Sequence, residues 1–515
     1  MNFRKFLDKV KYIAYAVTEI ILLFRKGSQM TEENITLTRS VSWKQGMFIA
    51  LGVPLLILPS LGDVSSLVWG CCIFVWTVSV LQGFVQNLAY GEMVTVFPNA
   101  TGLPGCAQAV FKSDKKVDGI DKGKLLGAFS AWCYWFAWCP VVVIFSMMIG
   151  DYLMQMFDLG FDGWMAVGFY FVVGVVIVAL MLLLGIRGLE GGATVGTILA
   201  LVSLIPIVVI LIGALAKGMF DFNVITSEWT RPGFSWSPED VVLILGCFAL
   251  GQWSACAWET AAVYGPEYKD PGRDVPKALF GCGIICLIMY FFVSTVVYGS
   301  LGYEAITEAG TATLKPIAEF VFGDMGSYIA LFFLIVAMIL IIQTGFLGSS
   351  RSLNSIAEEG NLPAWFCKKN SRGMPVNAMI FVSVFNLVLL LILEASSWVY
   401  GLSTTSMTIL TASAIGYCLA NGIALAAYVK TKRDPRFSGL ERPFKAPRGW
   451  TGVIAVMSCI QFFVWLPSLI YWSYYLSSDG GADTGITAYI AIVIAAIILL
   501  AYVPIWLAVQ KKNAA

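Results

Sequence analysis

One apolar stretch of this sequence carries an acidic side chain. The run FALGQWSACAWET (248–260) is apolar enough to lie inside a lipid bilayer, yet it contains Glu259. A charge is costly at that depth, so an ionisable group there indicates a functional site. Because removal from water favours the neutral acid, Glu259 could carry a proton, act as a gate, or only tie helices together. Trp253, six residues earlier, could cover a substrate by stacking or could serve only in packing.

Two apolar segments are interrupted, and these segments would position the side chains. In MFIALGVPLLILPSLGD (47–63), a Gly-Val-Pro sequence at 52–54 breaks the run. Proline removes a helical hydrogen bond, and a membrane tolerates such a break where it is buried in protein or lines a water-filled cavity. A second irregularity covers 251–257. Interrupted helices at corresponding positions of two halves point to a transporter's binding site near the bilayer midplane.

The composition is that of a polytopic membrane protein. Of 515 residues, 58% are hydrophobic and 13% are charged, whereas soluble proteins carry roughly 25% charged residues. The chain has no histidine, which excludes imidazole proton relays, histidine-ligated metals and Ser-His or Cys-His catalysis. Its 12 cysteines lack metal-ligand spacing and are expected to be reduced packing residues. We therefore expect no enzyme, metal or cofactor, and the net charge of +1 predicts no nucleic-acid partner.

Apolar segments recur along the chain, and most are long enough for the ~20 residues that cross a bilayer. We expect twelve helical spans, at 45–66, 68–95, 125–149, 164–186, 190–216, 239–264, 278–301, 326–350, 375–394, 400–429, 450–475 and 484–508. With the N-terminus inside, only Lys217, Arg231 and Lys315 of the 33 basic residues fall outside the cytoplasmic segments. Because basic residues concentrate in cytoplasmic loops, both termini are expected in the cytoplasm.

Residues 1–42 allow two interpretations. The apolar run from Tyr12 to Phe24 is too short to span a bilayer and contains Glu19. This cytoplasmic segment could be a basic interfacial helix, or translation could begin at Met30.

Four separated motifs carry a family resemblance. They are YGEMVTVFPNATGLPGCAQAVF (90–111), WETAAVYGPEYKDPGRDVPKA (258–278), SRSLNSIAEEGNLPAWF with RGMPVNA (350–378) and RPFKAPRG (442–449). In order and spacing the chain resembles the amino acid–polyamine–organocation (APC) transporter superfamily. The resemblance implies an all-α, LeuT-like fold in which five helices are repeated in inverted orientation, with helices 1 and 6 broken. It places the first repeat at 43–216, the second at 236–430 and two further helices at 450–508.

The resemblance also implies where substrate binds. The family's helix-1 motif Gly-Ser-Gly-Ile-Phe corresponds to 52–56, with Pro54 at the second glycine, so one backbone N–H is missing from the expected carboxylate cradle while that of Leu55 stays free. The expected substrate-binding residues are Gly52, Val53, Pro54, Leu55, Trp253, Ser254, Ala255, Cys256 and Ala257. Glu259 and Trp253 are expected to gate the site or handle a proton, because the chain is similar there to bacterial arginine–agmatine exchangers. The exchanger's guanidinium-contacting Asn and its Trp on helix 8 correspond to Val142 and Gly345, which favours a neutral substrate.

These observations predict a secondary active transporter in the plasma membrane. It would move a neutral amino acid by alternating access, as an exchanger or as a proton-coupled symporter, and as a monomer or a homodimer in the lipid bilayer. Two alternatives stay open at this point: an amine or polyamine transporter, and a nutrient sensor that transports nothing.

Overall fold

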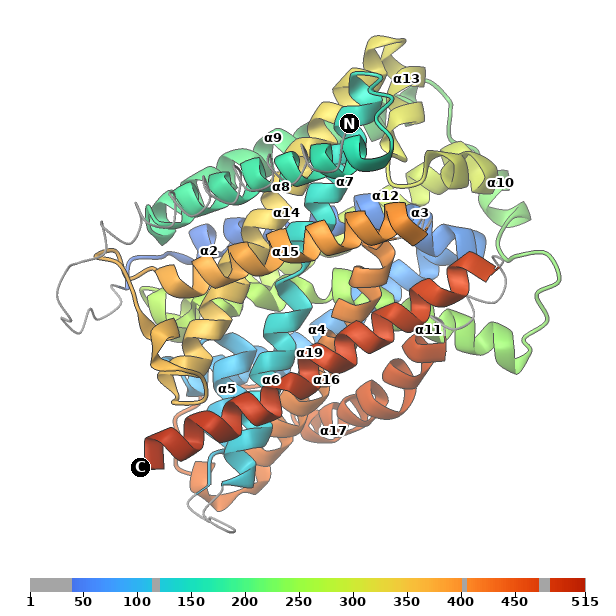
Figure 1. The fold of residues 1–515 in the computed structure, drawn as a ribbon. Coiled ribbons are helices and arrows are strands. Elements are labelled where there is room, and N and C mark those ends of the chain that lie inside the picture. Colours follow the sequence, from blue (N-terminus) through green and yellow to red (C-terminus); the bar gives the residue numbers. More distant parts are fainter. Residues whose placement is uncertain (1–38, 114–120, 401–404, 472–481, 515) are drawn as a thin grey trace.

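The computed structural model describes residues 39–113, 121–400, 405–471 and 482–514, and these residues form helices (Figure 1). Among them there is no β-strand, and the only β-type pairing is an isolated bridge between Val41 and Tyr268. The predicted all-α fold class is therefore confirmed. The two interpretations of 1–42 concern residues that lie, up to residue 38, outside the described part.

The helices follow the apolar segments of the sequence. In chain order they are α2 (Trp43–Ala50), α3 (Ile57–Val68), α4 (Cys72–Val96), α5 (Gly102–Phe111), α6 (Lys122–Trp138), α7 (Val141–Met156), α8 (Gly163–Gly185), α9 (Leu189–Ala216), α10 (Phe222–Ser227), α11 (Pro238–Ala255), α12 (Pro271–Ala309), α13 (Leu314–Phe322), α14 (Met325–Glu358), α15 (Val376–Tyr400), α16 (Thr405–Arg433), α17 (Trp450–Ile460) and α19 (Ala482–Ala514). Local signals fix several ends. Ser42 and Ser237 form capping boxes at the starts of α2 and α11, and Pro238 takes the first helical position, where its missing N–H costs nothing.

The membrane spans agree with the predicted count. Within the described residues, eleven helical stretches are long and apolar enough to cross a membrane, and the first of these, Trp43–Val96, contains both span 1 (α2 and α3) and span 2 (α4). Span 3 comprises α6 and α7, spans 4 and 5 are α8 and α9, and span 6 begins with α11. Spans 7 to 10 are α12, α14, α15 and α16, and spans 11 and 12 contain α17 and α19. The boundaries of the two repeats stay predictions.

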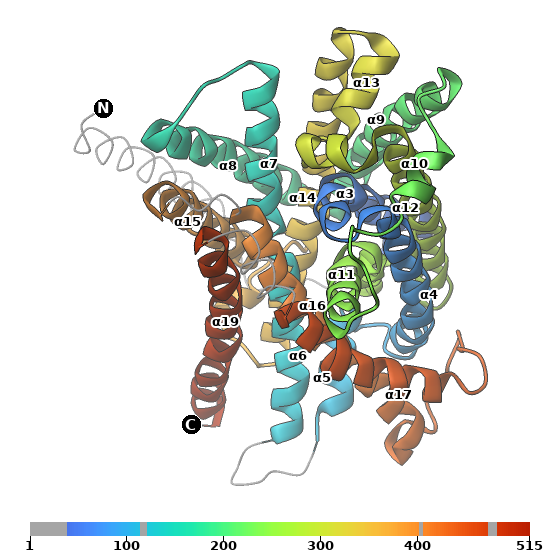
Figure 2. The same cartoon turned by 90° about the vertical axis from the view of Figure 1, so that its right-hand side faces the viewer.

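Long helix pairs build the core around the first and sixth spans. Span 2 packs along span 7, α6 along span 10, and α7 against span 8. Figure 2 shows α15 and α19 on one side of the molecule and α4 and α12 on the other, with α16 between them. The interior side chains of α6 and α7 are almost completely buried, so span 3 lies at the centre of the bundle.

Some local features were not predicted. Span 3, expected as one helix, is interrupted at Cys139 and Pro140 between α6 and α7, because Pro140 cannot donate to the preceding turn. The short helices α5, α10 and α13 were also missed, since they lie in connections between the spans.

Candidate functional site

Span 1 is interrupted by a 3-10 turn, η1 (Val53–Leu56), between α2 and α3. Pro54 has no N–H, so the carbonyl of Ala50 loses its helical donor. The thiol of Cys282 in span 7 lies 3.6 Å from that carbonyl and donates to it. A side chain from another span therefore satisfies the backbone group that the break frees.

Two further carbonyls beside this break are satisfied in the same way. The Thr344 hydroxyl in span 8 donates to the carbonyl of Ile49 at 2.7 Å, and the Tyr290 hydroxyl in span 7 donates to the carbonyl of Val53 at 3.2 Å. The expectation that the backbone N–H of Leu55 stays free is wrong. This N–H donates to the carbonyl of Gly52 at 3.2 Å, because the segment tightens into a 3-10 turn and does not unwind.

Span 6 changes from α-helix to 3-10 helix after α11. The 3-10 segment η3 (Ala257–Glu267) has eleven residues, although such runs rarely exceed 3–4 residues. The break was predicted over 251–257, but Trp253, Ser254 and Ala255 are α-helical and the change begins at Cys256. Small residues do not by themselves break a helix, because they keep their backbone hydrogen bonds. The N–H of Cys256 still donates to the carbonyl of Gln252 at 3.0 Å.

Glu259 lies inside η3, and the α-helix resumes only at Pro271, the start of α12. The two interruptions nevertheless meet, since η1 packs against α11 and α2 packs against η3.

Glu259 is fully buried among tyrosines from three other spans. The hydroxyls of Tyr134 (span 3) and Tyr417 (span 10) approach its carboxyl, and Tyr90 (span 2) lies within electrostatic range. Within the described residues, neither oxygen of Glu259 has a hydrogen-bond partner of normal geometry, and neither do the hydroxyls of Tyr134 and Tyr417. Tyr90 instead donates to Asn421 at 2.5 Å. A buried carboxyl with free lone pairs can hold a proton or accept hydrogen bonds from an ammonium group.

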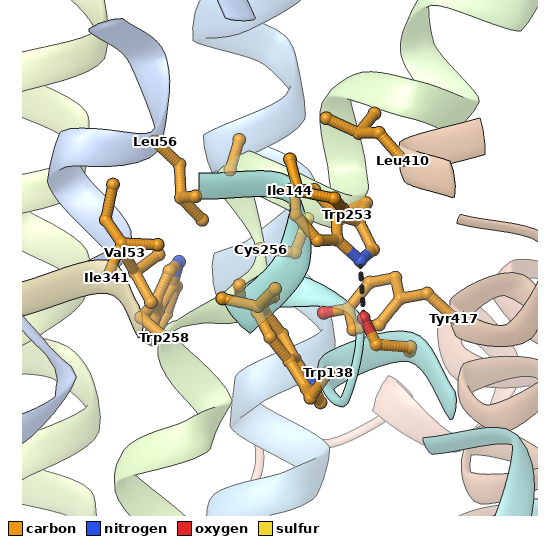
Figure 3. Close-up of a cluster of buried hydrophobic side chains, with 14 of the residues drawn as sticks. Val53, Leu56, Trp138, Ile144, Trp253, Cys256, Trp258, Ile341, Leu410 and Tyr417 are labelled. Carbon is orange, nitrogen blue, oxygen red and sulfur yellow. Dashed lines mark hydrogen bonds between the residues drawn. The ribbon is translucent and has the colours of Figure 1, made fainter. Parts of the chain in front are cut away.

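Trp253 connects span 6 to the interruption of span 3. Its indole N–H donates to the carbonyl of Ala137 at 3.0 Å, and its ring stacks on Trp138 with 5.6 Å between ring centroids and 21° between planes. The rings of Trp138 and Tyr417 form a T-shaped pair, with 6.0 Å between ring centroids and 86° between planes. Figure 3 shows these rings together, with the dashed bond at the Trp253 nitrogen.

Apolar side chains fill the space between the interruptions. Val53 and Leu56 of η1 lie near Cys256 and Trp258 of span 6, and Ile144, Ile341 and Leu410 complete the cluster (Figure 3). Val142 is buried as well, and a side chain at Gly345 would meet Val141 at 2.7 Å. The predicted substrate-binding residues thus come from two spans that the structure brings together.

The sequence motifs meet in two buried ion clusters that had not been predicted. Arg351 of span 8 forms a bidentate pair with Glu267 at the end of η3, at 2.8 and 3.3 Å, and its guanidinium lies 5.0 Å from the ring centroid of Tyr264. The signal for this pair was the presence of opposite charges in two motifs, but nothing in the sequence showed that the two would touch.

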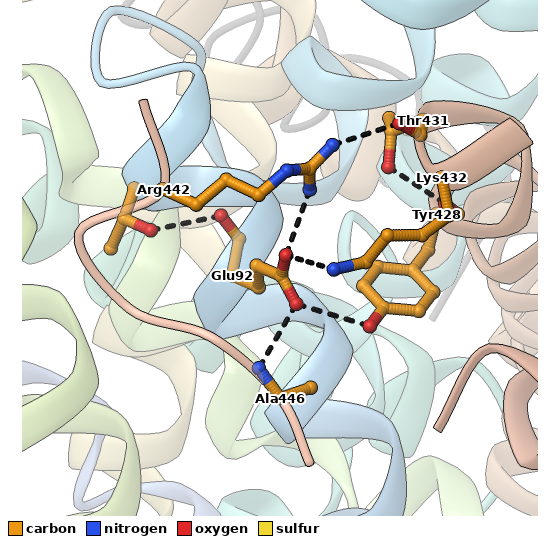
Figure 4. A network of polar contacts seen from close by, with 7 residues as sticks. Glu92, Tyr428, Thr431, Lys432, Arg442 and Ala446 are labelled. Atoms are coloured by element: carbon orange, nitrogen blue, oxygen red, sulfur yellow. Dashed lines mark hydrogen bonds and ion pairs between the residues drawn. The ribbon is translucent and has the colours of Figure 1, made fainter. Parts of the chain in front are cut away.

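The second cluster surrounds Glu92 of span 2 (Figure 4). Its carboxylate, which has no exposed surface, accepts from Lys432, from Arg442 at 2.8 Å, from the Tyr428 hydroxyl at 3.1 Å and from the Ala446 N–H at 3.0 Å. Charge-assisted bonds of this kind are the strongest hydrogen bonds in proteins. This cluster fixes the loop before span 11 to the end of span 2.

A bundle of membrane spans in which two interrupted helices pack together is an arrangement found in membrane transporters. The fold is similar to that of a solved manganese transporter from Eremococcus coleocola, with a TM-score of 0.57 and 12% identity over 94% of this chain and 100% of that one. Residues 41–500 match the family model for amino acid permeases. The chain belongs to the amino acid permease family of the APC superfamily; it is a multi-pass membrane transporter of amino acids and not an enzyme.

Curated relatives cover most of the chain. An uncharacterized amino acid permease, YecA, of Bacillus subtilis (strain 168) is 24% identical over 68% of this chain and 77% of its own length. A D-serine/D-alanine/glycine transporter of Escherichia coli (strain K12) is 22% identical over 79% of this chain and 83% of its own length.

Proposed function

We propose that this protein transports neutral amino acids across the plasma membrane by alternating access, with both termini in the cytoplasm. The orientation is supported by the basic residues, of which only Lys217, Arg231 and Lys315 fall outside the cytoplasmic segments. The substrate would bind between the interruptions of spans 1 and 6.

Glu259 carries the proposal. It is a fully buried carboxyl without a hydrogen-bond partner of normal geometry among the described residues, and it lies in the long 3-10 segment of span 6. A buried acid in a membrane interior is expensive and points to function. The substrate ammonium group, or a proton, would occupy its lone pairs during the cycle.

The surrounding side chains favour a neutral substrate. Val53, Leu56, Ile144, Ile341 and Leu410 offer no counter-charge for a guanidinium or a second ammonium group. Burying such a charge without a partner would cost several kcal/mol or more. The E. coli relative, a D-serine/D-alanine/glycine transporter, agrees with this choice.

Contacts between spans 6 and 8 support the proposal of alternating access. Glu267 pairs with Arg351 across spans 6 and 8. Beside this pair, the N–H of Val41 donates to the carbonyl of Glu267 at 3.0 Å, and the N–H of Lys269 donates back to Val41 at 2.9 Å. A path from the interruptions to the cytoplasm would have to break these contacts.

The proposal is tested by uptake into proteoliposomes. The panel consists of labelled glycine, alanine, serine, leucine, arginine and putrescine, with and without a proton gradient and with and without internal substrate. We expect uptake of one or more neutral members, with a requirement for internal substrate if the protein is an exchanger and for the gradient if it is a proton symporter. Uptake of putrescine or arginine alone would contradict the proposal.

Trp253→Phe tests whether the indole acts in the site. The ring of phenylalanine can still stack on Trp138, but the bond to Ala137 is lost. Alanine is a poorer choice, because truncating a fully buried tryptophan costs about 3–5 kcal/mol of stability. We expect Trp253→Phe to reduce uptake by about tenfold or more, as loss of one buried hydrogen bond allows, at normal expression. Wild-type uptake would remove Trp253 from the site.

A further inference from the structure

Three glutamine side chains from different spans form a buried network around Gln252, the residue directly before Trp253. Gln252 of span 6 accepts from Gln82 of span 2 at 2.8 Å and from Gln461 of span 11 at 2.7 Å. Its own amide group donates to Gln461 at 2.9 Å and to the Cys418 sulfur of span 10 at 3.1 Å. Both donors and both lone pairs of the Gln252 amide are therefore used.

The network is energetically sensitive to the loss of any member. Gln252 and Gln461 have no exposed surface. An amide left unpaired in an apolar medium costs about 1–3 kcal/mol by protein mutational measures. Because Gln252 and Gln461 exchange two hydrogen bonds, they hold their two spans in one register.

The helix of span 11 changes its geometry at this contact. Residues Gln461–Trp465 form a π-helical turn after α17. Such turns add a residue to the helix and are frequent at functional sites. Four residues on from Gln461, Trp465 stacks on Phe248 of span 6, at 5.8 Å between centroids and 25° between planes. Phe248 likewise lies four residues before Gln252, so matched pairs one turn apart join the two spans.

We propose that Gln461 is a positioning residue for the transport site. Through Gln252 it holds α11 so that Trp253 reaches Ala137 and the change to 3-10 helix falls at Cys256. Span 11, which lies outside the two predicted repeats, thereby becomes part of the site's support. The inference rests on the proposed transport function.

The test compares Gln461→Leu with the matched control Ser458→Ala. The Ser458 hydroxyl donates to the carbonyl of Gly422 at 2.8 Å, so this bond ties span 11 to span 10. KM and Vmax are measured in proteoliposomes with the panel member that wild type takes up fastest, and thermal stability is measured in detergent. We expect Gln461→Leu to raise KM about tenfold, equivalent to about 1.4 kcal/mol, and Ser458→Ala to leave KM unchanged.

The double variant Gln252→Leu with Gln461→Leu separates positioning from stability. Replacing both partners of a hydrogen-bonded pair by apolar groups is less costly than removing one of them. The double variant should therefore regain part of the lost stability, although the Gln82 amide then lacks its acceptor, while its KM stays high. An unchanged KM in Gln461→Leu, or recovery of KM together with stability in the double variant, would overturn the inference. If the single variant does not fold, the double variant decides alone. If wild type takes up no panel member, the proposed function fails instead.

Discussion

The buried ion pair between Glu267 and Arg351 offers a sharp test of how spans 6 and 8 are held together. The two nitrogen–oxygen distances are 2.8 and 3.3 Å, and the side chains are only 10% and 6% exposed. Glu267→Gln keeps the size of the side chain and removes its charge. The guanidinium then keeps the Tyr264 ring and the Met374 sulfur at 3.4 Å as neighbours, but no carboxylate.

The expected cost is large because the remaining charge is buried. One nitrogen of Arg351, Nη1, already lacks a hydrogen-bond partner among the described residues, so few other contacts remain to stabilise the guanidinium charge. Breaking a buried pair by removing one partner typically costs about 3–5 kcal/mol. The matched control is Glu358→Gln, which breaks the pair of Glu358 with Lys369 at the same end of the molecule. The Glu358 side chain is 43% exposed, and exposed pairs contribute about 0–1 kcal/mol.

Thermal unfolding in detergent measures both variants. Glu267→Gln should unfold at a clearly lower temperature than wild type, and Glu358→Gln at nearly the same one. The double variant Glu267→Gln with Arg351→Met should recover most of the loss, because it removes both buried charges. The reasoning is refuted if the two single variants are equally stable, or if the double variant is less stable than Glu267→Gln.

Two further predictions concern contacts between spans. Gly52→Ala should abolish uptake, because the added carbon would lie 2.6 Å from the Thr344 hydroxyl and would push span 8 away from the interruption. The control is Gly348→Ala, in which no atom lies within 4 Å of the added carbon. Equal uptake by the two variants would contradict the reasoning. Glu92→Gln removes the counter-charge of Arg442 and should release the loop before span 11. Faster trypsin cleavage of that loop in inside-out vesicles would support this, whereas an unchanged rate would show that the loop is held elsewhere.

The sequence predicted features that depend on local chemistry. Twelve apolar segments predicted the spans, because each must satisfy its own backbone in lipid. Pro54 predicted the first interruption, since proline cannot donate a hydrogen bond. Glu259 stood out because a carboxylate is rare inside an apolar run. The interruption of span 3 at Pro140 rests on the same signal and could have been found.

Tertiary structure decided how these features are partnered. The second interruption begins at Cys256 because the preceding residues keep their helical bonds, and no residue type in 251–257 shows this. The Tyr134 and Tyr417 hydroxyls near Glu259, and the pairing of Gln252 with Gln461, join residues more than a hundred positions apart. A single sequence gives the types of such side chains but not their distances. The sequence by itself therefore determined the membrane fold and its family, whereas only the packing of the spans decided which polar groups are satisfied within the protein.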